Sequence, residues 1–243
     1  MPITYFGSSS NPADADAATL SATPVAVTPP ASMVAGDLVV LIGQQRGTGT
    51  TIAMSALGGQ TWTTALLSNT ASNLSVLISY CRYNGTWAAN PSMSFSNSTC
   101  TTVVMHVFRP SSSSNLWGID TTGAFATFVA PVAPNDVTAS GITTTNSSTV
   151  SVFGWFTFDD NTWALNAGSN FVISGSAQYR NLAGSDMSST YAHCIQTAAG
   201  ATGSVTKQQA SLGPDAGGIA TVAFYEYSAG GAANTSNMFF GAG

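Results

Sequence analysis

Short runs of alternating apolar and polar residues, separated by turn-forming residues, dominate the chain. In the run 74–83, Leu74, Val76, Ile78 and Tyr80 alternate with residues that are mostly smaller or more polar. Successive side chains of a strand point to opposite faces, so this period of two predicts a half-buried strand. The same signal predicts strands over 37–43, 62–67, 74–83, 101–109, 149–158, 170–174, 190–197 and 219–227.

The number and spacing of these runs predict the fold class. Many short strands with Gly-rich turns are typical of an all-β, antiparallel β-sandwich or jelly roll, and no long helical periodicity competes with them. We expect one β-sandwich domain over 1–229, followed by a C-terminal tail over 230–243. Four tryptophans are expected to anchor its core: Trp62, Trp117, Trp155 and Trp163.

The two halves of the chain carry similar features in the same order. Each has an apolar strand, a tryptophan, a cysteine-bearing strand and a closing strand, with Cys81 in the first half and Cys194 in the second. This order suggests a pseudo-repeat with halves 1–130 and 137–229, joined by a Pro-containing connection. A chain built from few residue types also produces such likeness by chance, so both interpretations stay open.

The composition of the chain indicates a surface with little charge. Charged residues make up 6% of the chain, where a soluble domain usually carries about a quarter. The net charge is −5 and the five basic residues are scattered, whereas nucleic-acid binding needs clustered Lys and Arg. We therefore expect neither nucleic acid nor an anionic membrane as a partner. Weak repulsion between copies suits a protein packed against neighbours, although a secreted β-domain shares this composition.

No segment is expected to direct the chain into or across a membrane. A membrane-spanning helix needs about 18 apolar residues in a row, and no run approaches that length. The start, 1–5, lacks the basic region and apolar stretch of an export signal.

The cysteines and histidines offer weak candidates for chemistry. Three cysteines without a CxxC spacing predict neither a disulfide framework nor a zinc site. His193 and Cys194 are adjacent on a predicted strand, so they point to opposite faces and cannot form a dyad. His106 with Cys81 or Cys100 stays open as a nucleophile and base pair. We expect no catalytic residue, no cofactor and no metal.

Acidic residues and one loop give two further candidates. Asp159 and Asp160 stand beside Asn161, which could bind Ca²⁺, but without EF-hand spacing a polar hairpin turn is favoured. The segment 84–91 (NGTWAANP) reads as a loop, and it makes Trp87 and Asn84 the candidate ligand face. Trp87 could equally cap the core.

Several stretches resemble those of phage-encoded β-sandwich structural proteins. They are YFGS at 5–8, AGDLVVL at 35–41, GQTW at 59–62, YCRY at 80–83 and a strand closing in FR at 109. The closing features of the family resemble 199–206 and 219–224. The resemblance implies a virion component of the capsid, tail or baseplate, with copies of itself and other virion proteins as partners. It carries over no catalytic residues.

Together these features predict a non-enzymatic structural component of a phage particle, either a capsid decoration protein or a tail-associated protein. The alternative is a carbohydrate- or receptor-binding adhesin that binds a host surface glycan. A polysaccharide hydrolase would need a carboxylate pair in a cleft, for which few acidic residues are available. The tail ends in an uncharged apolar cluster, Met238, Phe239 and Phe240, which we expect to dock on a protein surface.

Overall fold

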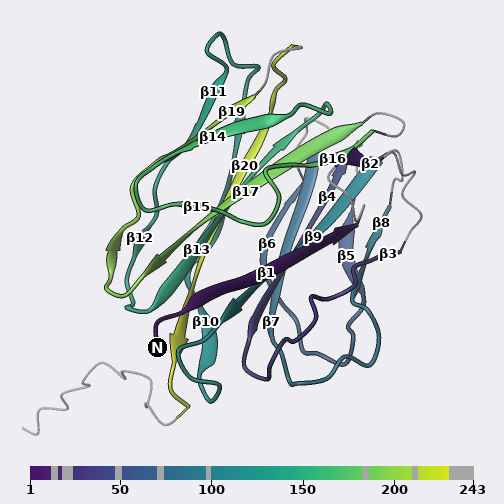
Figure 1. The fold of residues 1–243 in the computed structure, drawn as a ribbon. Helices are drawn as coiled ribbons and strands as arrows, with labels where there is room; N and C mark the ends of the chain where they lie inside the picture. The colour runs from purple at the N-terminus through teal and green to yellow at the C-terminus, as the bar shows by residue number, and fades with distance from the viewer. Residues whose placement is uncertain are drawn as a thin grey trace, which may run out of the picture.

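The computed structural model is built from strands alone in the residues that it describes, 1–11, 16–17, 24–46, 51–69, 74–96, 100–182, 186–209 and 213–229 (Figure 1). The expectation of an antiparallel β-sandwich is confirmed, and the jelly roll stays a prediction. Within the same residues no helix is long and apolar enough to span a membrane.

The N-terminal strands form a large sheet and a small one. The large sheet has the order β1-β9-β4-β7-β6, and the small sheet has the order β3-β8-β5. All neighbouring pairs are antiparallel. Their bounds are β1 (Thr4–Asn11), β3 (Val25–Ala26), β4 (Leu38–Arg46), β5 (Ile52–Ala56), β6 (Thr63–Asn69), β7 (Leu74–Arg82), β8 (Ser92–Phe95) and β9 (Cys100–Arg109).

The C-terminal strands form a second large sheet and a second small sheet. The short N-terminal strand β2 joins the large one by a parallel pairing with β16. The large sheet runs β10-β20-β13-β17-β16-β2, with β15 also paired to β17, and the small sheet runs β11-β19-β14. Strands β12 and β18 form a separate pair. The bounds are β2 (Asp16–Ala17), β10 (Leu116–Phe128), β11 (Asp136–Ala139), β12 (Thr143–Thr144), β13 (Thr149–Thr157), β14 (Trp163–Ala167), β15 (Val172–Ile173), β16 (Tyr179–Asn181), β17 (Met187–Gln196), β18 (Gly200–Ala201), β19 (Val205–Gln209) and β20 (Gly217–Tyr227).

The two strand sets share one topology. The order β1-β9-β4-β7 in the first set corresponds to β10-β20-β13-β17 in the second, and β3-β8-β5 corresponds to β11-β19-β14. Even an irregularity recurs: the register of β1 shifts between Tyr5 and Gly7, and that of β10 shifts between Ile119 and Thr121, at matching places along the ladder. Because β10 pairs with β20, the second set begins at β10, earlier than the expected connection at 130–136.

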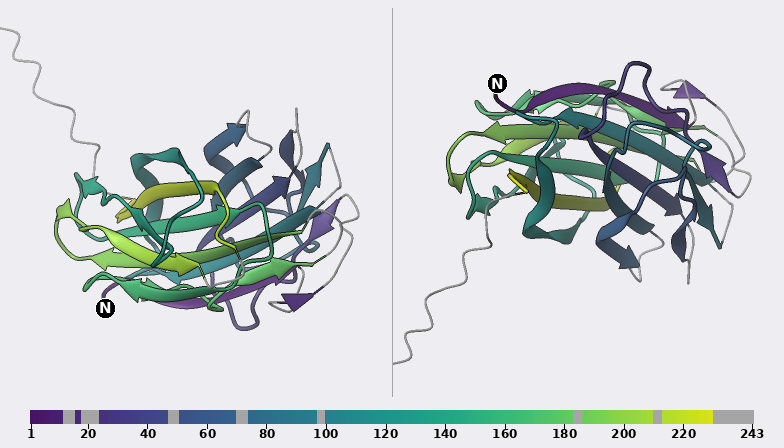
Figure 2. Two further views of the ribbon diagram at one scale, coloured as in Figure 1. Left: turned by 90° about the horizontal axis from the view of Figure 1, so that it is seen from above. Right: turned by 90° about the horizontal axis from the view of Figure 1, so that it is seen from below.

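The sheets stack in four layers, with the two large sheets facing each other in the middle (Figure 2). Strand β4 illustrates why its sequence is apolar without interruption. Leu38, Val40 and Ile42 face the second large sheet, whereas Val39 and Leu41 face the small sheet β3-β8-β5. Both faces of β4 are buried, which a continuous apolar run indicates. Strand β13 has the same role in the second set, between the central core and the sheet β11-β19-β14.

The central contact joins the two sets in a nearly symmetric way. At one margin β1 meets β16, where the hydroxyls of Ser8 and Tyr179 lie 3.2 Å apart. At the other margin β10 meets β6, and a Cβ on Gly123 would lie 3.0 Å from the Cβ of Leu66. The first strand of each set thus meets the fifth strand of the other set's large sheet, as in a two-fold symmetric dimer.

Two sequence expectations are corrected in detail. Trp117, Trp155 and Trp163 are buried, but Trp62 is only half-buried, because it lies where the chain enters β6 at the end of the sandwich. Its indole NH donates to the carbonyl of Leu57 at 2.8 Å. The strand expected over 170–174 is reduced to two residues, β15.

Candidate functional site

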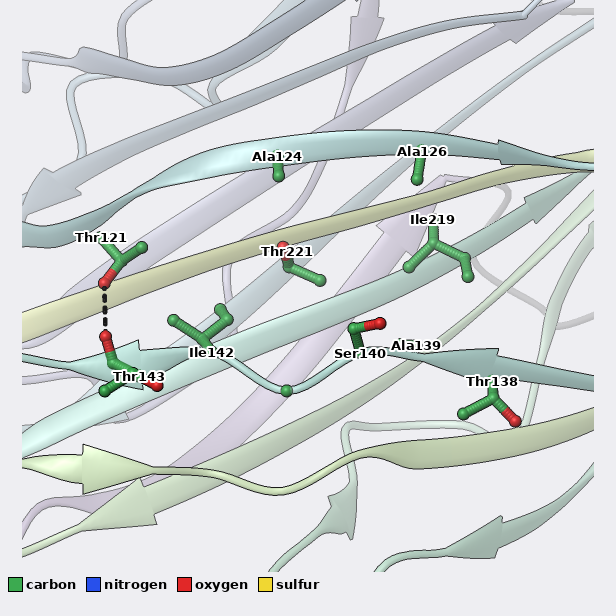
Figure 3. A pocket seen from close by; sticks show the side chains of 11 residues that line it. Thr121, Ala124, Ala126, Thr138, Ala139, Ser140, Ile142, Thr143, Ile219 and Thr221 are labelled. Carbon is green, nitrogen blue, oxygen red and sulfur yellow. Dashed lines mark hydrogen bonds between the residues drawn. The ribbon is translucent and has the colours of Figure 1, made fainter.

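A groove along β10 is the first candidate site (Figure 3). Its cavity is about 380 Å³. The floor is the outer face of β10 and β20, where Ala124, Ala126, Ile219 and Thr221 lie side by side. The wall is the segment 138–143, which comprises the end of β11, the connection 140–142 and the start of β12.

The chemistry of this groove is apolar with hydroxyls. Its lining consists of alanines, isoleucines, threonines, a serine and a glycine, without any titratable side chain. Thr121 donates to the carbonyl of Thr143 at 3.3 Å and ties the wall to the floor. Strand β10 is the end strand of its sheet, so an extended peptide could also add to its edge. The groove can therefore hold apolar side chains of a peptide.

A second groove, of about 410 Å³, lies between β5 and β6. Leu57 and Leu67 are 49% and 51% exposed at it, which is unusual for large apolar side chains, and the half-buried Trp62 also lines it. The hydroxyl of Ser79, fully buried, faces this groove and makes no hydrogen bond within the described residues. This groove is a second exposed apolar patch on the first strand set.

In the loop predicted as a ligand face, the side chains of Trp87 and Asn84 make contacts within the fold. Trp87 is half-buried and stacks on Tyr83, with ring centroids 5.1 Å apart. Asn84 is exposed, but its amide donates to the carbonyl of Gly59 and its side-chain oxygen accepts from Gln60 at 3.0 Å. These bonds occupy the groups that Asn84 would offer to a sugar.

Acidic side chains from three distant segments gather at one end of the second set. Carboxylate oxygens of Asp159, Asp160 and Asp186 all lie within 4.8 Å of one another, an arrangement that could hold a metal ion. Burial and neighbouring carboxylates raise the pKa of Asp186 and, mainly through burial, that of Asp215. The hairpin turn predicted at Asp159 and Asp160 is wrong: the bend at 158–159 leads from β13 to β14, which belongs to another sheet. The approach of Asp186 and Asp215 was not predicted either, because no local signal links them.

Two arginines already neutralise much of this acidic group. Arg46 lies 3.5 Å from Asp186, and Arg180 lies 3.5 Å from Asp160. The side chain of Arg180 also donates to the carbonyl of Asp160 at 2.8 Å. Ion pairing therefore explains the cluster as it stands.

The cysteines and histidines are separated by the sheets. Cys81 belongs to the outer core of the first set, on the face of the large sheet opposite that of the Cys100 side chain. Cys100 and His106 share β9 but are six residues apart, which is about 20 Å in a strand. Neither open pairing with His106 thus forms a dyad. Burial raises the pKa of Cys100 to about 12 and also raises that of Cys194.

The five basic side chains are all engaged within the fold. Three form ion pairs, one donates to backbone carbonyls, and one is buried against an aromatic ring. They are Arg46 with Asp186, Arg109 with Asp37, Arg180 with Asp160, Arg82 with the carbonyls of Asn115 and Ser113, and Lys207 with Trp155. Burial lowers the pKa of Lys207 to about 8. The surface consequently offers almost no free cation to a partner.

The remaining predicted site residues, Met238, Phe239 and Phe240, lie outside the described residues. Comparison with known proteins gives no family: no family model, no curated protein and no solved structure matches this chain.

Proposed function

We propose that this chain is a non-enzymatic structural component of a phage particle, a capsid decoration or tail-associated protein that acts through contacts with copies of itself and other virion proteins. The observation that supports this most is that all five basic side chains interact with other groups of the same chain. A surface with few charges lacks the repulsion that keeps copies apart. Dense packing in an assembly tolerates such a surface well.

Two further features support the proposal. The four layers bury both faces of the large sheets, which suits a rigid building block. Two apolar grooves lie at the strand edges β10 and β5–β6, where protein partners can dock. The resemblance of the YFGS, AGDLVVL and GQTW stretches to phage structural proteins agrees with this role.

Mass spectrometry of purified, salt-washed particles tests the proposal. We expect the chain in a fixed copy number per particle: a high number for a capsid decoration protein and a low one for a tail component. An antibody against the chain should label the particle in electron micrographs. Its absence from washed particles, with the free chain present in the lysate, would refute a structural role.

A receptor- or carbohydrate-binding adhesin is the second candidate. It is favoured by the half-buried Trp62 beside an apolar groove, because indole rings stack on sugar faces. The Trp87 ring lies 6.4 Å from the Trp62 ring between centroids. A glycan array with the purified chain and a Trp62→Ala variant separates the two roles. Glycan binding that disappears in the variant would favour the adhesin.

A further inference from the structure

The β10 groove differs from its counterpart in the first strand set. The matching gap between β1 and β3 is lined by Ser8, Ser9, Ser10 and Asn11, and Tyr179 of the second set closes it from the other side. The β10 groove instead has an apolar floor with no charge. Two gaps of the same topology therefore have different chemistry, and only the second can hold apolar side chains.

The chain itself contains a segment that fits this chemistry. Residues 230–243 read GGAANTSNMFFGAG, a run of small and polar residues ending in an apolar trio, without any charge. The trio would bury apolar surface worth about 25 cal/mol per Å². A charged groove would oppose such a segment, whereas the uncharged floor at Ala124 and Ala126 accepts it.

The direction of β20 takes the chain away from its own groove. The groove lies beside Ile219 and Thr221, but the chain leaves the strand at Tyr227, about 20 Å further on. To return, the tail would have to reverse and pass along β10. Backbone amides of Thr145 and Asn146 donate to Asp120 of β10 at 2.9 and 2.7 Å, so residues after β12 already occupy that stretch of the strand.

We propose that residues 238–240 of one copy dock in the β10 groove of a neighbouring copy. The contact deepens the proposed function, on which it rests, by naming the surface through which copies join. From Ala229 the nine residue steps to Met238 span at most about 30 Å, enough to bridge two adjacent molecules. Because tail and groove are different surfaces, the contact is head-to-tail and can extend into a ring or row.

Two complementary variants test this contact in solution. Deleting 234–243 removes the tail and leaves the groove, whereas Ala126→Arg blocks the groove and leaves the tail. We expect the unmodified chain to self-associate in analytical ultracentrifugation and each variant to be a monomer. An equimolar mixture of the two should form a one-to-one dimer, because each supplies what the other lacks. Ala164→Arg, at an exposed site on β14, is the control and should associate normally.

Peptide binding provides the second measurement. A fluorescent peptide of residues 230–243 should bind the tail-deleted chain and bind its Ala126→Arg form at least about tenfold more weakly. Circular dichroism checks folding, and Ala124→Arg replaces Ala126→Arg if that variant is unfolded. Monomeric unmodified chain, unaltered association of either variant, or a mixture that stays monomeric would each overturn the proposal. These measurements use no particle, so they can fail while the chain is still found in virions, and the reverse.

Discussion

Two buried histidines predict that this protein loses stability below about pH 6.5. His106 is fully buried between the large sheets, with Nδ1 3.5 Å from the hydroxyl of Tyr5. Its Nε2 makes no hydrogen bond within the described residues. His193 is 3% exposed and shares a hydrogen bond of 2.7 Å with Ser174. Burial, aided by the nearby His193, lowers the pKa of His106 to about 3, and burial lowers that of His193 to about 4.

The magnitude follows from these shifts. Below pH 6.5 the unfolded chain binds protons at both imidazoles while the folded chain does not, so stability is full above that pH and falls as pH decreases towards 4. Each histidine that stays neutral in the folded chain lowers the free energy of unfolding by about 1.4 kcal/mol for every pH unit of acidification in this range. At pH 4.5 the loss is about 2.7 kcal/mol per histidine, or about 5 kcal/mol for both. Domains are typically stable by only about 5–15 kcal/mol.

His106→Phe isolates the effect. The ring fills the same aromatic surroundings, next to Tyr5 and Tyr191, and removes a buried nitrogen without a partner in the described structure. Both tyrosines are neutral at acidic pH, and burial raises the pKa of each. Urea unfolding at intervals from pH 7 to 4.5 should give the variant a slope about 1.4 kcal/mol per pH unit smaller than the original chain.

A control separates titration from packing. Ser189→Ala changes another fully buried side chain, and this side chain cannot titrate. Its effect on the free energy of unfolding should be the same at every pH. The carboxylates with raised pKa, such as Asp186, contribute equally to each chain, so differences between chains cancel them. If His106→Phe and the original chain keep a constant difference from pH 7 to 4.5, the histidine is already protonated or exposed and the reasoning is wrong.

Three further predictions concern the core and its margins. Trp155→Ala should lower the free energy of unfolding in urea by about 3–5 kcal/mol. Trp62→Ala should lower it by at most about half of that, because Trp62 is only half-buried. Equal losses in the two variants would contradict this difference in burial. Cys81 should react with a thiol reagent slowly in the native protein and rapidly in urea, because its thiol is buried and burial raises its pKa; rapid native labelling would place it at the surface. Asp37→Asn should destabilise the fold by about 1–3 kcal/mol, because the buried carboxylate accepts from Arg109 and from a backbone amide; an unchanged urea midpoint would mean these bonds contribute little.

Apolar runs located the central strands because those strands are buried on both faces. The ranges 37–43, 74–83 and 149–158 correspond to β4, β7 and β13, which form the middle of the large sheets. Strand β10, the longest in the part of the chain that the structure describes, was not predicted. Its register shifts after Ile119 and again after Thr121, and each shift reverses which residues face the core. A period-two pattern cannot survive two such shifts.

Contacts between distant segments could not be predicted from the sequence for a different reason. The AGDL stretch contains the residues of two local features: a turn at Gly36, whose φ is +101°, and an Asp37 side chain that accepts from a backbone amide. It did not predict Arg109, which is 72 residues away and pairs with Asp37 through the β4–β9 register. The acidic group at Asp159 and the groove at Ala124 depend on strand order in the same way.

The two strand sets share a topology but differ in what their corresponding edges, β1 and β10, can bind. Packing the two large sheets face to face uses the most apolar surfaces of both strand sets, as in a symmetric dimer that is already complete. Further contacts can therefore use the strand edges, which differ between the two sets. The first set keeps hydroxyls at its β1 edge, with Ser8 bonded to Tyr179 of the second set. The second set leaves alanines at the β10 edge. Because of this difference the molecule is not symmetric at its edges, so copies can associate head-to-tail.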